Sequence, residues 1–355
     1  MTDGTEAAQR VRALVEGARR IADAGTELGR RARTDLVRTT GLSPEGVSLA
    51  LAECLETEPS DAEIATLCAG VRPAAAAHVL LSANVFVAAH RALALALAAS
   101  VRVRVRPSRR EPSFARLLAE AAPGLFEITD ELAPEAGDAF FAYGTDETLE
   151  TVRKSLPDGV SYHPHGSGFG VAVVDSAHAT RETARALAGD VVPFDQRGCL
   201  SPRALVFAGS DADARAFAEL VAAELSVIAE RVPLGRLDPD EAADVTRFRD
   251  ATDYAGSALS AGPGWVGVIA REALVVAPVG RNLAVVSCRA PVALVESHAG
   301  SIAALGLAAD AKLARALCSA VRGARESALG RMQRPPFDGP VDRRAIGKAP
   351  DSAPP

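Results

Sequence analysis

Long apolar runs, a secretory leader and an excess of positive charge are all missing from this sequence. Its most apolar stretch, residues 75–100, is interrupted by Asn84, His90 and Arg91, so it falls short of the ~20 apolar residues that a membrane-spanning helix needs. Residues 1–35 are arginine-rich and helix-periodic, without the single apolar segment of a signal peptide. A net charge of −6 gives no overall attraction to nucleic acid or anionic lipid. We therefore expect a cytoplasmic protein that spans no membrane and binds no nucleic acid.

Cysteine is scarce and is not arranged in pairs. The five cysteines show no CxxC spacing, and an odd number in a reducing compartment argues against a disulfide framework. His163 and His165 have no third ligand at a convincing spacing, so no metal site is expected. Four cysteines fall in apolar helical or strand patterns, where free cysteine is usually a small buried hydrophobe: Cys54, Cys68, Cys288 and Cys318.

The fifth cysteine, Cys199, has different surroundings. It follows Arg197 and Gly198 in an irregular loop and precedes an apolar strand-like stretch. A thiolate is the reactive form of cysteine, and a nearby cation or backbone N–H groups lower the thiol pKa. Cys199 is therefore the candidate nucleophile, with a small structural residue as the alternative.

No repeat of fixed period is present, which excludes solenoids and propellers. With 355 residues, 48% of them hydrophobic, the chain is long for one core, since single cores stop growing at about 250–300 residues. Residues 5–38 and a capping box from Ser60 to Glu63 predict a helical lead-in. From Met332 onward the chain is proline-rich and has little to bury, so we expect an extended or disordered tail.

Between lead-in and tail, strand-like and helical stretches alternate. Strands are expected at 76–82, 101–106, 139–143, 169–174, 204–208, 265–270 and 283–289, with helices at 86–99, 113–122, 145–156, 179–188 and 211–230. An irregular loop is expected at 190–203. This rhythm predicts an α/β fold with two doubly wound parallel sheets, and ligands beyond the carboxyl ends of the strands.

Five motifs occur in an order that resembles the aldehyde dehydrogenase superfamily. They are SANVF (82–86), VRVRPS (103–108), AYGTDE (142–147), HGSGFG (165–170) and DQRGCLSP (195–202). Within the superfamily, the sequence is most similar to the acyl-CoA reductases typified by the fatty-acid reductase of bacterial bioluminescence. The resemblance implies a helical lead-in plus NAD(P)-binding domain at residues 1–170, a catalytic cysteine domain at 171–330, and a tail at 331–355.

The resemblance also implies catalytic roles. Cys199 would carry the acyl group as a thioester, and Asn84 would donate a hydrogen bond to the oxyanion of the tetrahedral intermediate. His165 stands where hydrolytic relatives have a glutamate, 199 − 165 = 34 residues before the cysteine. It would assist thiol deprotonation or protonate the leaving thiol. The alternatives are a turn or helix cap for Asn84, and a loop histidine without a role for His165.

The implied cofactor site follows the second and third strands. Arg106 and Ser108 occupy places that bind the adenosine ribose, and Arg109 stands where the family often has glutamate. A guanidinium grips a 2′-phosphate, which favours NADP(H), with NAD(H) as the alternative. Gly144 and Thr145 would present helix N–H groups to the pyrophosphate. Alternatively, the arginines form a solvated face and a surface turn, and Thr145 is a simple N-cap.

The resulting hypothesis is an acyl-CoA reductase, an oxidoreductase of the acylating aldehyde dehydrogenase type. It would take an acyl group from acyl-CoA or an acyl-carrier protein and reduce the cysteine thioester with NADP(H) to an aldehyde. One alternative is an acyl-phosphate reductase of the glutamyl-phosphate type, and another is a catalytically silent binding or assembly module. The sequence leaves open the acyl chain length and the presence of a homo-oligomer, because no oligomerisation hairpin can be identified.

Overall fold

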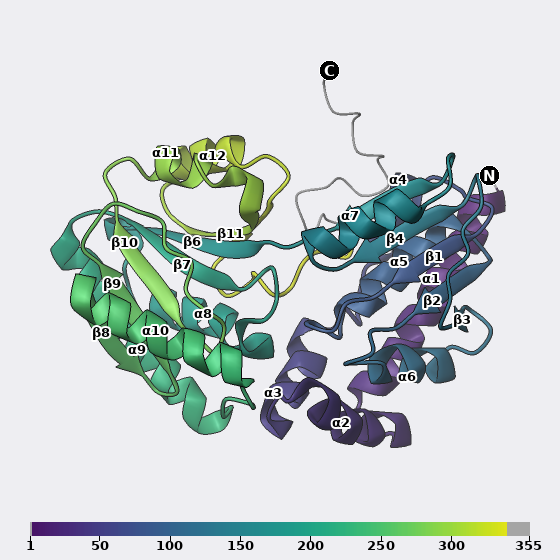
Figure 1. Ribbon diagram of the computed structural model, residues 1–355, viewed down its shortest axis with the longest axis horizontal. Coiled ribbons are helices and arrows are strands. Elements are labelled where there is room, and N and C mark those ends of the chain that lie inside the picture. Colours follow the sequence, from purple (N-terminus) through teal and green to yellow (C-terminus); the bar gives the residue numbers. More distant parts are fainter. Residues whose placement is uncertain (1, 339–355) are drawn as a thin grey trace.

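The computed structural model describes residues 2–338, which build two sheets lying side by side (Figure 1). The first sheet has the order β3-β2-β1-β4-β5, and all its pairs are parallel. Its strands are β1 (Ala77–Leu80), β2 (Val103–Arg106), β3 (Glu127–Ile128), β4 (Ala139–Tyr143) and β5 (Ser161–His165). The expected α/β class is therefore confirmed.

The second sheet has the order β12-β11-β6-β7-β10-β9-β8 and is parallel except for the pair β8–β9. Its strands are β6 (Phe169–Asp175), β7 (Pro202–Ala208), β8 (Gly256–Ala261), β9 (Gly264–Ile269), β10 (Leu283–Ser287), β11 (Ile302–Ala308) and β12 (Arg325–Ala328). Parallel strands need crossover connections, and helices supply most of them.

The helices are α1 (Thr2–Ala22), α2 (Glu27–Thr40), α3 (Pro44–Leu49), α4 (Asp61–Gly70), α5 (Ala88–Ala99), α6 (Ser113–Ala121), α7 (Asp146–Ser155), α8 (Arg181–Val191), α9 (Asp211–Arg231), α10 (Pro239–Ala255), α11 (Pro291–Glu296) and α12 (Ala311–Ala320). Short helical turns are η1 (Ala50–Cys54), η2 (Ser176–His178), η3 (Pro193–Gln196) and η4 (Ala299–Ser301). The expected capping box is present, with Ser60 and Glu63 opening α4. Within the described residues, none of these helices combines the length and apolarity that crossing a bilayer requires.

Alternation along the strands separates the two faces of each sheet. Val79 and Phe141 point into a core shared with α1, α5 and α6, whereas Phe140 packs on the opposite face with Leu149 of α7. In the second sheet, Ala172 belongs to the core under α8 and α9, and its neighbours on β6 belong to the core under α11 and α12. Both sheets are thus covered on two faces, as parallel sheets require.

The expected loop at 190–203 is more regular than the sequence indicates. Helix α8 continues to Val191 and is followed almost directly by η3, so only 197–201 remain between η3 and β7. The sequence pattern predicted neither the strands β3, β5, β8, β11 and β12 nor the helices α3, α10, α11 and α12. β5 reads Ser-Tyr-His-Pro-His and lies at the edge of its sheet, which is where a strand tolerates proline.

The expectation that the stretch from Met332 has little to bury is wrong for its first part. Met332 is 0% and Phe337 2% exposed, and Phe337 belongs to the core of the first sheet's domain. Arg325 donates hydrogen bonds to the backbone oxygens of Met332, Arg331 and Arg334. We call residues 330–338 the C-terminal strap. The remainder of the expected tail, 339–355, lies outside the described residues.

Candidate active site

The sequence-predicted residues lie at the ends of strands, and those of the first sheet share one edge. Asn84 follows β1, Ser108 and Arg109 follow β2, Thr145 follows β4, and His165 ends β5. Because these strands are parallel, all these residues lie at one edge of the first sheet. Cys199 precedes β7 and therefore lies at the opposite kind of edge, the amino ends of the second sheet.

The loops that carry Asn84 and Cys199 touch each other. Val85 Cγ2 lies 3.1 Å from the point where a Cβ on Gly198 would stand, so these two residues pack directly. The Phe86 and Phe194 rings meet edge to face, with centroids 5.7 Å apart. Helix α5 starts at Ala88 with Val87 at the N-cap position, so the alternative role of Asn84 as a helix cap is wrong. Asn84 is exposed and lines a small hollow together with Phe194 and Arg197.

The turn that precedes Cys199 has an unusual backbone. Phe194, Asp195 and Gln196 have φ values of 57°, 49° and 68°, a left-handed conformation that non-glycine residues rarely adopt. Such residues cost of order 1–3 kcal/mol each and persist only where their surroundings hold them. Two buried side chains of this turn, Asp195 and Gln196, provide that support.

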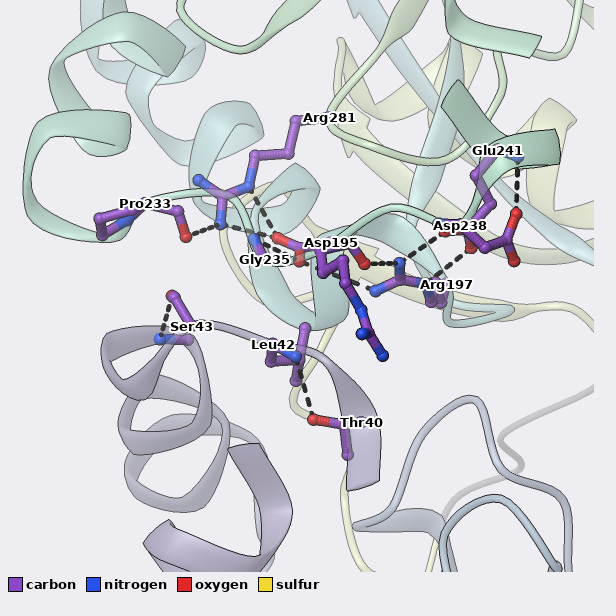
Figure 2. A network of polar contacts seen from close by, with 12 residues as sticks. Thr40, Leu42, Ser43, Asp195, Arg197, Pro233, Gly235, Asp238, Glu241 and Arg281 are labelled. Atoms are coloured by element: carbon purple, nitrogen blue, oxygen red, sulfur yellow. Dashed lines mark hydrogen bonds and ion pairs between the residues drawn. The ribbon is translucent and has the colours of Figure 1, made fainter. Parts of the chain in front are cut away.

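Asp195 is the centre of a buried polar network (Figure 2). Its Oδ1 accepts hydrogen bonds from Arg281 Nη2 at 2.8 Å and Nε at 3.1 Å, and both side chains belong to residues only 1% exposed. Its Oδ2 accepts from the Gly235 N–H at 3.0 Å. A Cβ on Gly235 would stand 2.3 Å from Gly41 O, so only glycine fits here. The turn before Cys199 is thereby joined to the loop between α2 and α3.

Gln196 fixes the same turn to the start of β10. Its Nε2 donates to the backbone oxygens of Pro202 and Asn282, and its Oε1 accepts from the Asn282 N–H at 2.8 Å. All hydrogen bonds of this buried amide are therefore made within the protein, which sets the side chain's orientation. The strained turn is held from two sides.

Arg197, two residues before Cys199, is bound to carboxylates on either side. Its Nε and Nη2 bind the Glu241 carboxylate at 2.8 and 2.7 Å, and its Nη1 lies 3.7 Å from Asp195 Oδ2. The hydrogen bond to Glu241 raises the pKa of Arg197. Two carboxylates therefore compensate this cation, and its contacts help to position the loop.

The other cysteines are poor nucleophiles. Burial raises the pKa of Cys54 to about 12, and burial together with Glu326 raises that of Cys318 to about 12. Burial also raises the pKa of Cys68 and Cys288. Thiols with raised pKa values hold little thiolate at neutral pH. Cys199 is half-buried and lies in the loop between the sheets.

His165 stacks on Tyr143, with ring centroids 4.2 Å apart and planes at 5°. The chain beyond it runs against the Cys199 turn, since the Gly170 N–H donates to Ser201 O at 2.9 Å. A Cβ on Gly170 would stand 2.7 Å from Leu200 O, so this close approach needs glycine. Its neighbour His163 is buried, and burial followed by the charge of His165 lowers the pKa of His163 to about 4.

The edge of the first sheet beyond β2 and β4 carries the expected cofactor residues. Arg106 and Ser108 are half-buried and Arg109 is exposed. Among the described residues neither guanidinium has a hydrogen-bond or ion-pair partner. Thr145 is the N-cap of α7 and accepts a hydrogen bond from the Thr148 N–H. Unpaired guanidinium groups at the carboxyl edge of a parallel sheet fit a phosphate-bearing cofactor.

Several buried polar residues of this site escaped the sequence analysis. Arg281 and Asn282 stand directly before an apolar strand, and Gln333 lies in the expected tail; Glu241 opens α10. One signal was available in the sequence: Arg281 and Asn282 stand directly before a fully apolar run. A charged residue at such a place is expected to be buried, and a buried charge requires a partner. Their partners lie tens of residues away and leave no local pattern.

Comparison with known proteins identifies the family and the fold. A family model described as acyl-CoA reductase (LuxC) matches residues 69–339. No curated protein matches the chain. Similar solved structures include an oxidoreductase from Marinobacter aquaeolei, with a TM-score of 0.67 and 14% identity over 90% of this chain and 78% of that one. Lactaldehyde dehydrogenase from Escherichia coli has a TM-score of 0.65 and 15% identity over 92% and 78%.

An NAD-dependent benzaldehyde dehydrogenase from Corynebacterium glutamicum has a TM-score of 0.64 and 14% identity, covering 90% of this chain and 81% of its own. At such identities the likeness establishes the aldehyde dehydrogenase fold alone. The family model shows more than the fold, because its match extends over most of the chain and includes the Asn84, His165 and Cys199 segments. The protein therefore belongs to the acyl-CoA reductase (LuxC) family of oxidoreductases.

Proposed function

We propose that the protein reduces an acyl thioester to an aldehyde through a covalent thioester on Cys199. The observation that carries this proposal is the position of Cys199, on a rigidly held turn whose neighbour Gly198 packs against Val85, next to Asn84. A nucleophile and an amide donor on touching loops are what acyl transfer needs. The family to which the chain belongs supports the same substrate class.

In the first step of this reaction, three residues of the chain have separate roles. The Cys199 thiolate attacks the thioester carbonyl, and the Asn84 side-chain N–H stabilises the oxyanion that forms. Collapse of this intermediate breaks the carbon–sulfur bond of the donor, and the free thiol leaves with a proton that His165 supplies. Because position 165 holds histidine where hydrolytic relatives have a glutamate, we assign His165 to proton transfer with the donor's thiol, and the acyl group stays on Cys199 for reduction.

We also propose NADP(H) as the cofactor, held by Arg106, Ser108, Arg109, Gly144 and Thr145. When bound, it supplies the hydride that converts the thioester to the aldehyde. Arg109 supports NADP(H) over NAD(H), because a guanidinium attracts the 2′-phosphate that a carboxylate would repel. In the same proposal, residues 1–170 bind the cofactor and residues 171–330 carry the nucleophile.

The direct test is intact-mass analysis after incubation with a panel of acyl-CoA, acyl-carrier and acyl-phosphate donors. We expect one acyl adduct, lost in Cys199→Ala and retained in the control Cys68→Ala, which alters a half-buried cysteine of α4. Addition of NADPH should then discharge the adduct as aldehyde. Retention of adduct and aldehyde formation in Cys199→Ala would disprove the assignment.

A further inference from the structure

A hollow of about 160 Å³ opens between the N-terminal helices and the second domain. Residues from four parts of the chain line it: Thr39 and Thr40 at the end of α2, Arg110 after β2, Arg197 in the nucleophile turn, and the segment from Arg236 into α10. It shares Thr39, Thr40, Arg110 and Arg197 with the smaller hollow that Asn84 lines. The larger hollow therefore adjoins the candidate oxyanion site.

Its polar lining has an uneven balance of charge. Arg110, Arg197 and Arg236 face Asp238 and Glu241, three cations against two anions. Both carboxylates are already engaged: Glu241 accepts from Arg197 and from the Asp238 N–H, and Asp238 accepts from the Glu241 N–H. The pKa of Glu241 lies below its ordinary value because these bonds and the charge of Arg110 outweigh burial, which raises it.

Two guanidinium groups of the lining, those of the exposed residues Arg110 and Arg236, are not bonded to either carboxylate. Among the described residues, neither Arg110 nor Arg236 has a hydrogen-bond or ion-pair partner for its side chain. The backbone of Arg236 is nevertheless fixed, since its N–H donates to Gly41 O at 2.7 Å and its oxygen accepts from Arg197 Nη2 at 3.0 Å. Figure 2 shows Thr40 and Leu42 of the N-terminal part lying opposite Asp195 and Arg197 across this region. The backbones on both sides of the hollow are thus held in place before any ligand arrives.

Arg110 also differs from its neighbour Arg109. Arg110 lines the hollow shared with Asn84, whereas Arg109 lines neither hollow. A group bound by Arg110 therefore lies toward the reacting atoms, on the side of the acyl donor. Paired guanidinium groups recognise phosphate through charge-assisted, bidentate hydrogen bonds. Acyl thioesters of CoA and of carrier proteins share one such group, the phosphate at the far end of the pantetheine arm.

We infer that Arg110 and Arg236 bind the phosphate of the acyl donor's phosphopantetheine arm in this hollow. The inference rests on the proposed acylation of Cys199 and assigns the donor's recognition to a site made largely by the N-terminal helices and the segment before α10. Such a site would distinguish phosphopantetheine thioesters from thioesters without phosphate. The cofactor's 2′-phosphate belongs elsewhere, at Arg109.

The test measures the single-turnover rate of Cys199 acylation by intact mass, with one acyl group on four donors: pantetheine, phosphopantetheine, CoA and a carrier protein. The natural chain should react at least about tenfold faster with acyl-phosphopantetheine than with acyl-pantetheine, a factor that corresponds to about 1.4 kcal/mol. Arg110→Gln/Arg236→Gln should abolish this difference while leaving the acyl-pantetheine rate and the KM for NADPH unchanged. Arg315→Gln, an exposed arginine on α12, is the matched control.

The remaining arms identify the source of the phosphate. The donor whose rate falls in the double variant, acyl-CoA or the acyl-carrier protein, is the one that uses the hollow, and a fall with neither overturns the inference. Equal rates of the natural chain with acyl-pantetheine and acyl-phosphopantetheine would also overturn it while leaving the proposed function intact. A raised KM for NADPH would move the pair to the cofactor site. If no donor acylates Cys199, the proposed function fails first.

Discussion

Gln333 Nε2 donates hydrogen bonds of 3.0 Å to Ser201 Oγ and to Asp190 O, and so joins the C-terminal strap to the turn that carries Cys199. Asp190 completes the attachment, because its carboxylate accepts from the Gly330 and Met332 N–H groups at 2.6 and 2.9 Å. On the other side, Arg91 donates to the oxygens of Pro336 and Phe337. The strap therefore contacts both domains and the nucleophile loop at once.

The first prediction concerns Gln333→Ala. The change leaves a buried serine hydroxyl and a buried carbonyl without this donor, which costs about 1–3 kcal/mol of unfolding free energy. Because Ser201 lies two residues from Cys199, we also expect slower acylation of Cys199 and an unchanged KM for NADPH. Urea unfolding and single-turnover acylation measure the two effects. Gln9→Ala, at an exposed position of α1, is the control, and equal acylation rates in both variants would refute the positioning role.

The second prediction concerns the buried pair of Asp195 and Arg281. Arg281→Met removes both hydrogen bonds that Asp195 Oδ1 accepts from Arg281 and leaves only Arg197 Nη1, 3.7 Å from Oδ2, as a nearby cation. Breaking a buried ion pair in this way typically costs about 3–5 kcal/mol. Asp195→Asn in the same chain removes the stranded charge, and asparagine tolerates the left-handed φ of 49° at this position. We therefore expect the double variant to be more stable than Arg281→Met alone. Denaturant midpoints of the three chains decide this, and additive losses would contradict it.

Local signals in the sequence were enough for much of the fold. The apolar strand Ala139–Tyr143 and the N-cap Thr145 were predicted from neighbouring residues alone. The edges at which Asn84, His165 and Cys199 lie follow from the parallel arrangement, which the alternating pattern indicates. These features depend on residues within one or two turns of the chain.

The rest depends on contacts between distant residues. Asp195 and Arg281 are 86 positions apart, and Gln333 lies 132 positions from Ser201. Proline enrichment predicted an open tail, yet Phe337 is buried in the core of the first sheet's domain, where it packs against His90 and Arg91 of α5. The composition of a segment indicates how much apolar surface the segment can bury by itself. It does not indicate whether another part of the protein covers that segment. The strap was therefore beyond the reach of sequence patterns.

The third prediction compares two glycines. Gly235→Ala places a methyl group 2.3 Å from Gly41 O and 2.8 Å from Asp195 Oδ2, so the loop between α2 and α3 has to move away from the nucleophile turn. We expect lower thermal stability and slower acylation. Gly189→Ala, on the exposed side of α8 with no atom within 4 Å, should instead add about 0.5–1 kcal/mol through helix propensity. Equal shifts in Tm for the two variants would contradict the close approach.

The last prediction is a loss of stability in acid through His90. This side chain is fully buried, and neither ring nitrogen has a hydrogen-bond partner among the described residues. Burial, followed by the charge of Arg91, lowers the pKa of His90 to about 3. The folded protein therefore binds this proton less readily than the unfolded chain, whose histidine has a pKa near 6.5. The stability that neutral His90 contributes is fully present above pH 6.5 and is lost as the pH falls toward 3.

Over this window the loss amounts to about 1.4 kcal/mol for each pH unit, or roughly 2 kcal/mol between pH 6.5 and 5. His90→Leu removes the titrating group and no hydrogen bond, so its unfolding free energy should fall less steeply between pH 7 and 5. His163, whose pKa is lowered to about 4, keeps part of the acid dependence in that variant. Gln9→Ala, at an exposed position of α1 without a titrating group, should retain the full slope. Parallel pH profiles for the natural chain and His90→Leu would show that His90 is protonated without opening the core, contrary to its burial.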